Sequence, residues 1–393
     1  MTRTMKWIRP LAAAALACAL AAPALRAQQK QAPAPVLKQE LRGKFLIGAA
    51  INLAQIEGRD TQGSALVRRE FNTISPENVL KWEAVHPKPD SFAFAAPDRY
   101  VAFGQKNGLV VIGHTLVWHS QTPRWVFQDA AGQPASRDTL LARMRHHILT
   151  VVGRYKGRIK GWDVVNEALN EDGTLRQSPW LKIIGEDYIA QAFRFAHEAD
   201  PRAELYYNDY SLENAAKRAG AVALIRKLQA EGIRVAAVGL QGHYKMGWPA
   251  PAALDSTIAA FAALGVKVNI TELDVDVLPP ARPQYRGADV SFRADTSSAL
   301  NPYARALPDS MQQALARRYA DIFAVLLARR GVVERVTFWG VDDADSWLNN
   351  WPVRGRTSYP LLFDRAGQPK AAFDAVVEAA RRARAARQPT SSR

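Results

Sequence analysis

The chain has 393 residues, 48% of them apolar, and a formal net charge of +15, so it is long and apolar enough for one large domain or two medium ones with a packed core. Four basic residues lie within the first 26 positions and five follow Glu378 without an acidic residue among them. The central body is therefore only moderately basic, and without an RNA-binding, helix-turn-helix or zinc-finger signature the charge indicates a solvated surface and no nucleic-acid partner.

Residues 1–27 have the pattern of a secretory signal peptide. Three basic residues precede an apolar run over positions 11–25, which ends in small residues. This run is too short to span a membrane and no later run is long enough, so we expect no transmembrane segment. Cleavage after Ala24 or Ala27 and a secreted or periplasmic location are the expected outcomes.

The only cysteine, Cys18, lies inside that apolar run. A lipoprotein signal around it is the alternative interpretation, but too little apolar sequence precedes the cysteine. A mature chain without cysteine has neither a disulfide nor a thiolate metal site, so its packed core must hold the fold.

Beyond a linker at residues 28–42, rich in Gln, Pro and Ala, short apolar runs alternate with longer segments of helical spacing. The expected strands are residues 45–51, 71–74, 109–114, 161–167, 204–208, 235–240, 266–272 and 336–340. The expected helices are residues 64–71, 97–107, 136–155, 188–200, 212–231, 251–264, 311–329 and 371–387. Eight strands alternating with eight helices predict a single-domain (β/α)8 barrel of the α/β class over residues 43–380, followed by a basic tail at 381–393.

A doubly wound open sheet is the alternative architecture, but it does not require eight repeats and the sequence has no glycine-rich phosphate loop. One connection, residues 278–309, is too long for an ordinary loop. In a barrel it follows the seventh strand on the catalytic face, where it forms either a wall of the cleft or a surface insertion.

Two of the expected strands end in glutamates with polar neighbours. Residues 161–167 end in Asn166 and Glu167, and residues 266–272 end in Glu272, with Asp274 two positions later. A barrel brings the C-terminal ends of its strands to one face, where enzymes of this fold place their chemistry.

The other strand ends add amides, imidazoles and indoles to the same face. The residues expected there are Glu77, Asn78, Lys81, His114, Trp118, Asn166, Glu167, Asn208, Gln241, His243, Glu272, Asp274, Trp339 and Trp347. Indole faces stack on sugar rings and polar groups bind hydroxyls. A single strand-terminal glutamate is more often a structural hydrogen-bond partner, whereas two on one face match the pair of carboxyl groups that glycosidic cleavage requires.

A metal site is the alternative for His114, His119 and His243. No HExxH motif or Cys/His ligand spacing supports it, so we expect neither a metal nor an organic cofactor.

At these residues the sequence resembles glycoside hydrolase family 10, the endo-β-1,4-xylanases, over nearly the whole chain after about Gly43. The matching segments are residues 77–78 (EN), 81–82 (KW), 113–121 (GHTLVWHSQ), 162–167 (WDVVNE), 241–243 (QGH), 271–274 (TELD), 339–340 (WG) and 346–347 (SW). So many motifs in one order make the resemblance specific.

The resemblance implies an eight-fold barrel and a retaining mechanism in which Glu167 is the acid/base and Glu272 the nucleophile. It implies that Asp274 and His243 orient the nucleophile and that Asn166 donates to the sugar 2-hydroxyl. The residues that it assigns to substrate binding are Glu77, Asn78, Lys81, His114, Trp118, Asn166, Gln241, His243, Trp339 and Trp347.

The sequence therefore predicts an endo-1,4-β-xylanase that acts on xylan or xylo-oligosaccharides as a monomer. A related barrel enzyme acting on β-1,4-glucan or mannan is the nearest alternative. A non-catalytic sugar-binding protein is the alternative from another class, but such a protein has no need of two glutamates with these neighbours.

Overall fold

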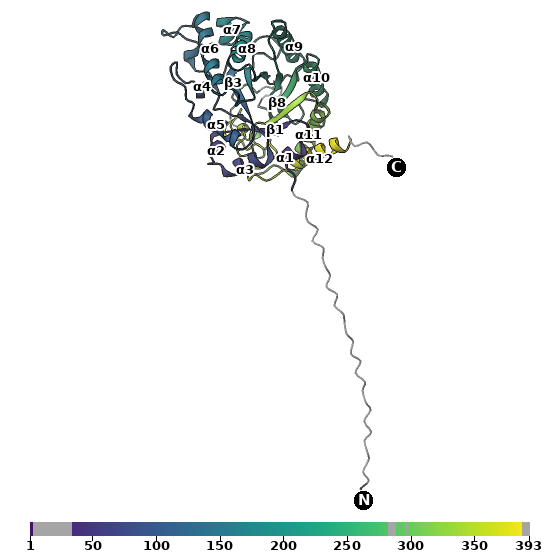
Figure 1. The fold of residues 1–393 in the computed structure, drawn as a ribbon. Coiled ribbons are helices and arrows are strands. Elements are labelled where there is room, and N and C mark those ends of the chain that lie inside the picture. Colours follow the sequence, from purple (N-terminus) through teal and green to yellow (C-terminus); the bar gives the residue numbers. More distant parts are fainter. Residues whose placement is uncertain (3–33, 282–287, 296, 387–393) are drawn as a thin grey trace. The chain divides into compact units, whose positions relative to one another are not determined.

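The computed structural model describes residues 1–2, 34–281, 288–295 and 297–386 (Figure 1). The chain divides into residues 1–34 and a folded body from residue 35 onward. Most of the predicted leader with its Cys18, and residues 387–393 of the predicted tail, lie outside the described residues. No helix within the described ranges is long and apolar enough to cross a membrane.

Parallel strands form the centre of the folded body. Their bounds are β1 (Leu46–Ile51), β2 (Thr73–Pro76), β3 (Val110–Val117), β4 (Gly161–Asn166), β5 (Glu204–Asp209), β6 (Ala237–Leu240), β7 (His243–Lys245), β8 (Lys267–Asp276) and β9 (Val333–Phe338). The sheet order is β6-β5-β4-β3-β2-β1-β9-β8, and pairing of β6 with β8 closes it into a barrel. The short β7 pairs only with the outer end of β8. The predicted single-domain (β/α)8 barrel is confirmed.

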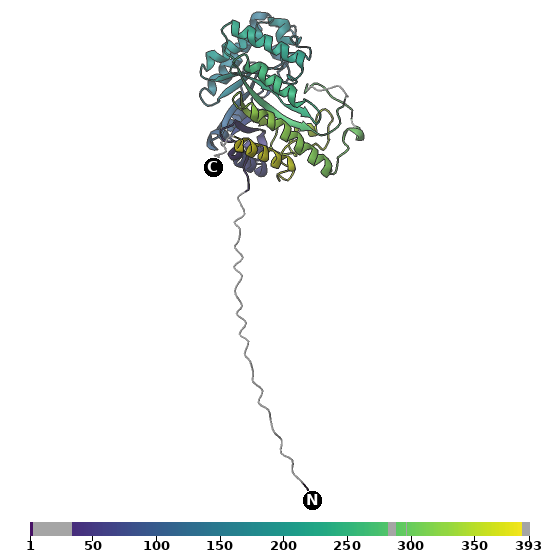
Figure 2. The same ribbon diagram turned by 90° about the vertical axis from the view of Figure 1, so that its right-hand side faces the viewer.

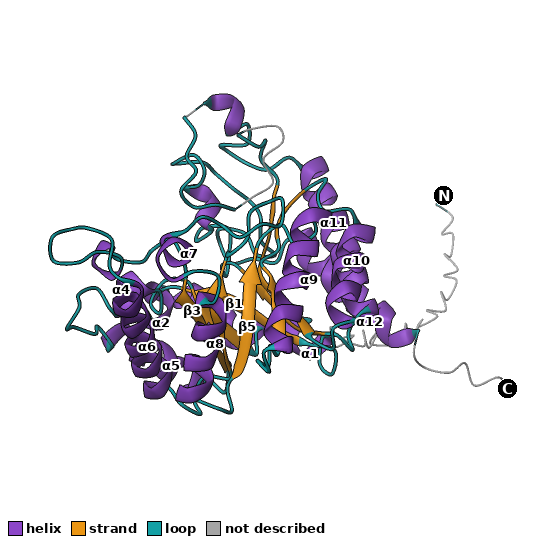
Figure 3. Cartoon of the chain, turned by 90° about the horizontal axis from the view of Figure 1, so that it is seen from above, coloured by secondary structure: helices purple, strands orange, loops and turns teal. Residues whose placement is uncertain are grey.

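Helices surround these strands, as seen from above in Figure 3. Their bounds are α1 (Leu37–Glu40), α2 (Leu53–Ile56), α3 (Thr61–Glu70), α4 (Trp82–Val85), α5 (Ala95–Lys106), α6 (Arg137–Arg154), α7 (Pro179–Ile184), α8 (Tyr188–Ala199), α9 (Ala215–Ala230), α10 (Pro251–Ala262), α11 (Asp309–Ala328) and α12 (Ala371–Ala385). The last two run side by side (Figure 2). Helices such as α5, α6, α8 and α10 pack buried apolar side chains against the strands, and α11 packs against α12, which is the layer packing that surrounds a barrel core.

Local signals set several helix starts. The side chain of Ser136 accepts a hydrogen bond from the Thr139 amide and begins α6, and Asp60 accepts from the Gly63 amide and begins α3. Such caps satisfy amide groups that have no partner within the helix. Asp60 places the start of α3 three residues before the predicted helix at 64–71.

Some strands are longer than predicted. β3 was expected to end at His114 but continues to Val117, because Leu116 and Val117 are also buried, and β8 continues past Glu272 to Asp276. The end of β8 therefore carries both Glu272 and Asp274, and its pairing with β9 shifts register between Ile270 and Leu273, next to Glu272.

The folded body also begins earlier than the predicted boundary at residue 43. Helix α1 lies within the segment expected to be a linker, with Leu37 and Leu41 buried and the Leu37 amide donating to Glu70 at 2.9 Å. Arg381, in the expected tail, lies in α12 and donates to Glu40 at 2.7 Å. The two ends of the body are thus joined by packing and charge, which composition alone did not indicate.

Candidate active site

A cavity of 650 Å³ opens at the C-terminal ends of the barrel strands. Both predicted catalytic residues line it, together with all ten predicted substrate-binding residues: Glu77, Asn78, Lys81, His114, Trp118, Asn166, Glu167, Gln241, His243, Glu272, Trp339 and Trp347. Asp274 lies behind this surface and is buried. The barrel thus brings together side chains from the ends of six barrel strands spread over 271 residues of sequence, from Glu77 to Trp347.

Glu167 directly follows β4 and is a buried carboxyl group held by neutral donors. Trp118 Nε1 donates to its Oε2 at 2.8 Å, Gln241 Nε2 donates to its Oε1 at 3.0 Å, and Asn166 Nδ2 donates to Oε1 at 3.2 Å. Burial raises the pKa of Glu167 to about 7, since the lowering effect of these hydrogen bonds is smaller and the charge of Asp209 adds to the rise. At neutral pH this carboxyl group can therefore hold a proton and donate it.

Glu272, in β8, is equally buried but has a charged donor. His243 Nε2 donates to its Oε2 at 3.1 Å, and Asn208 Nδ2 donates to its Oε1 at 2.9 Å. Burial alone would raise the pKa of Glu272, but these hydrogen bonds and the charges of His114 and His243 outweigh it and lower the pKa. The Glu272 side chain is thus ionised at neutral pH.

Asp274 keeps His243 charged. His243 Nδ1 donates to Asp274 Oδ2 at 3.0 Å, and the same oxygen accepts from Trp347 Nε1 at 2.7 Å. Burial would lower the pKa of His243, but the charge of Asp274 and the hydrogen bonds to Asp274 and Glu272 raise it to about 9. A cation therefore lies directly beside Glu272.

Asn208, at the end of β5, links the surroundings of the two glutamates. Its Nδ2 donates to Glu272 and to Asn166 Oδ1, both at 2.9 Å, while its Oδ1 accepts from Thr271 Oγ1 at 2.6 Å. A Cβ at Gly239 in β6 would lie 2.1 Å from Asn208 Oδ1, so this position must be glycine for the amide to fit. The sequence placed Asn208 on the catalytic face but did not indicate this bridge.

A second group of buried charges supports the backbone at Glu167. Arg176 Nε donates to the Glu167 carbonyl at 3.1 Å, and its Nη2 donates to the Tyr210 hydroxyl at 2.7 Å. Lys217, fully buried, lies 3.0 Å from Asp209 and 3.6 Å from the centre of the Tyr210 ring. Sequence reasoning missed these residues because they lie on loops and a helix start, where neither motif nor periodicity identified them.

Lys81 and its neighbours form another part of the cavity wall. Lys81 Nζ donates to Asn78 Oδ1 at 3.0 Å and to Gln121 Oε1 at 2.8 Å, and it lies 5.2 Å from the Trp118 ring centre. Burial lowers the pKa of Lys81 and raises the pKa of Glu77. Gln121 was not predicted as a site residue, although it lies in the quoted 113–121 segment.

Two of the three histidines considered for a metal site, His114 and His243, contact carboxylates, whereas Nδ1 of His119 is buried without a hydrogen-bond partner among the described residues. His114 Nδ1 lies 2.9 Å from Asp163 Oδ2, and His243 contacts Glu272 and Asp274 as described. In the described part of the chain, no group of three or more His, Asp, Glu or Cys side chains is arranged to hold a metal ion.

The insertion at 278–309 contributes directly to the cavity. Ala288, Val290 and Arg293 line it, so this part of the connection forms a wall of the cleft. Beside it, Trp347 stacks on Trp351 with ring centres 4.5 Å apart. The remaining lining residues, which the sequence did not predict, are Ser120, Ala344, Asp345, Ser346, Asn350 and Trp351.

Comparisons with known proteins identify the family of the chain. The family model for glycosyl hydrolase family 10 matches residues 36–379. Endo-1,4-beta-xylanase A of Xylanibacter ruminicola is 44% identical over 344 residues, which cover 88% of this chain and 93% of the relative. A beta-1,4-xylanase of Dictyoglomus thermophilum is 42% identical over 356 residues, covering 90% and 94% of the two chains.

A solved structure of an endoxylanase from a sugarcane soil metagenome superposes with a TM-score of 0.84 at 44% identity, covering 87% of this chain and 99% of that one. The barrel and its pair of buried glutamates define the class of protein as a glycoside hydrolase. Within that class, the chain belongs to glycosyl hydrolase family 10, as its sequence motifs predicted.

Proposed function

We propose that the protein is an endo-1,4-β-xylanase that hydrolyses internal β-1,4-xylosidic bonds of xylan or xylo-oligosaccharides with retention of configuration. One observation carries the proposal: two buried glutamates line one cavity, and their neighbours move their pKa values in opposite directions. Paired carboxyl groups with different protonation states are what glycosidic cleavage requires. The xylanase relatives and the family membership support xylan as the substrate.

In this mechanism Glu272 attacks the anomeric carbon while Glu167 gives its proton to the departing glycosidic oxygen. A covalent glycosyl-enzyme forms, and Glu167, now ionised, takes a proton from the water that releases the sugar. Retention needs carboxyl groups about 5–5.5 Å apart. The hydrogen-bonded link from Glu272 through Asn208 and Asn166 to Glu167 fits such a short separation.

Substrate binding is assigned to the polar and aromatic walls. Glu77, Asn78, Lys81, His114 and Gln241 bind sugar hydroxyls on the non-reducing side of the cleaved bond, with Trp118, Trp339 and Trp347 as apolar walls. The hydrogen bond to Asp274 and the stacking on Trp351 hold the Trp347 indole in place. A fixed indole there excludes the hydroxymethyl group of glucose and favours xylose. We also propose that the protein is an exported monomer.

Proton NMR of the anomeric signals during hydrolysis of xylohexaose tests this proposal. We expect the β-anomer to form first, before mutarotation, with internal cleavage products. First formation of the α-anomer would overturn retention and the nucleophilic role of Glu272. Faster hydrolysis of carboxymethylcellulose than of xylan would instead assign the site to glucan.

A further inference from the structure

Arg293 is an exposed cation on the wall of the catalytic cavity. Its Nη1 donates to the backbone carbonyls of Val290 and Phe292 in its own loop. Arg293 forms no ion pair within the described residues. The N–H groups on its Nε and Nη2 therefore bind no carboxylate of the described protein. A guanidinium group held at one nitrogen and open at the other two is suited to bind an anion.

The loop that carries Arg293 is attached to the barrel on two sides. Asp289 lies 3.2 Å from Arg176, whose Nε donates to the Glu167 carbonyl, and Asp289 also accepts from the Ser291 amide at 2.9 Å. On the other side the Ala294 amide donates to the Pro352 carbonyl at 3.0 Å. These contacts fix the backbone on both sides of Arg293 next to the catalytic residues.

The other cations of the cavity wall are already occupied. Lys81 is buried and donates to Asn78 and Gln121, and His243 donates to Glu272 and Asp274. Among the described lining residues, Arg293 is therefore the permanent cation with donors left free to bind a ligand. An unbranched xylan offers it hydroxyl groups only, which bind a guanidinium more weakly than a carboxylate does.

We infer that Arg293 binds the carboxylate of a uronic acid branch on the xylan chain and directs cleavage to branched regions. The inference rests on the proposed xylanase function and names the substrate class of the same site. Carboxylates match the two-pronged donor geometry of a guanidinium, and the contact needs no change in the catalytic residues. Arg293 is in this respect a specificity residue.

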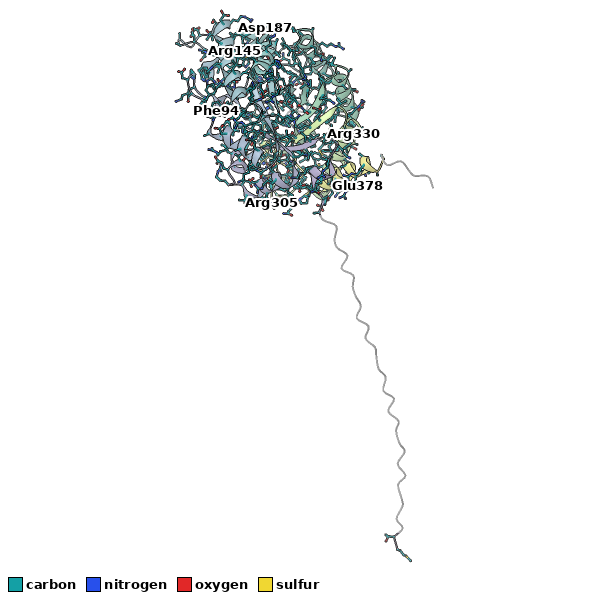
Figure 4. The ribbon with its side chains drawn as sticks, in the orientation of Figure 1. Phe94, Arg145, Asp187, Arg305, Arg330 and Glu378 are labelled. Atoms are coloured by element: carbon teal, nitrogen blue, oxygen red, sulfur yellow. The ribbon has the colours of Figure 1, made fainter. Side chains whose placement is uncertain are left out.

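Three substrates distinguish a contact with the carboxylate from an effect of Arg293 on the shape of the cavity. They are linear xylohexaose, a xylo-oligosaccharide with one uronic acid branch, and the same branched compound with its carboxyl group reduced to an alcohol. The variant is Arg293→Gln. The matched control is Arg305→Gln, an exposed arginine of the same insertion that does not line the cavity (Figure 4).

We expect kcat/KM of Arg293→Gln to fall about fivefold on the acidic substrate and to stay near the wild-type value on the other two, since an exposed ion pair contributes on the order of 1 kcal/mol. High salt should reduce the difference because it screens exposed charges. The Arg305→Gln control should match the wild type on all three substrates. An equal loss on all three substrates, or no loss on the acidic one, would overturn the assignment.

Calorimetric binding separates failure of this inference from failure of the proposed function. If wild-type protein does not hydrolyse xylohexaose, the proposed function fails. The role of Arg293 can still be decided by comparing the affinities of the wild type and of Arg293→Gln for the acidic compound and for its reduced form. Equal affinities of the wild type for the two compounds would reject it.

Discussion

The ends of β4 and β8 carry the same residue type at similar burial, yet they differ in the charge of their hydrogen-bond donors. Burial raises the pKa of Glu167 to about 7, because its uncharged donors from Trp118, Gln241 and Asn166 do not offset the cost of burying a charge. Glu272 receives a donor from the cationic His243, and its pKa falls. The comparison shows that the neighbouring side chains, and not the glutamates themselves, set which carboxyl group carries the proton.

Removing the β8 carboxylate should have the largest effect. Glu272→Ala should lower kcat on xylan on the order of 10⁵-fold, because no group remains to form the covalent intermediate. Added azide should enter the vacated space and give the α-glycosyl azide, inverted from the substrate. Mass spectrometry and NMR of the product check this. Near wild-type activity of the variant would refute the assignment.

Removing the β4 carboxylate should be less severe. Glu167→Ala should reduce kcat about 10³-fold on xylan, within the usual contribution of a general acid and base. For substrates whose leaving group needs no proton, such as a dinitrophenyl xylobioside, the rate of the first step, which forms the glycosyl-enzyme, should fall much less. Azide should now give the β-glycosyl azide, because it attacks the covalent intermediate. The same azide anomer from both variants would show that the two roles are not separate.

The smallest change should come from the charge beside Glu272. In the wild type, kcat/KM should fall above about pH 7, because Glu167 loses its proton there. It should also fall in acid as Glu272 becomes protonated, at a pH below the ordinary pKa of a glutamate. His243→Gln keeps a possible donor but removes the cation, so the Glu272 pKa rises. The acid limit should then move upward by about one pH unit while the alkaline limit stays. An unmoved acid limit would contradict the role given to His243.

The fold was accessible from the sequence because barrel periodicity assigns strand ends to one face, and the family resemblance pointed to individual residues on that face. Glu167, Glu272 and Gln241 lie at the ends of short apolar runs, Trp347 lies in the connection after β9, and all four line the cavity. The supporting contacts were not accessible in the same way. The sequence around Lys217, at the start of a helix, predicts an ordinary exposed lysine. In the structure, tertiary packing buries it completely beside Asp209.

The boundaries of the domain were also hidden from composition. Leu37 lies among Gln, Pro and Ala residues that suggest a linker, and only contact with Glu70 from α3 reveals it as part of the core. Composition also could not show whether the long insertion at 278–309 is a wall of the cleft or a surface insertion. Its position near the catalytic face follows from chain order, whereas the presence of Arg293 in the cavity wall depends on anchoring by Arg176 and Pro352.

The backbone at Glu167 is strained. Its φ of +57° is a conformation that glycine adopts freely and that a glutamate adopts at a cost of about 1 kcal/mol. A glycine there would relieve this strain but would leave the buried donors of Trp118 and Gln241 without an acceptor, at a cost of about 1–3 kcal/mol each. The strained backbone is thus held in place by the same hydrogen bonds that hold the carboxyl group in the cavity.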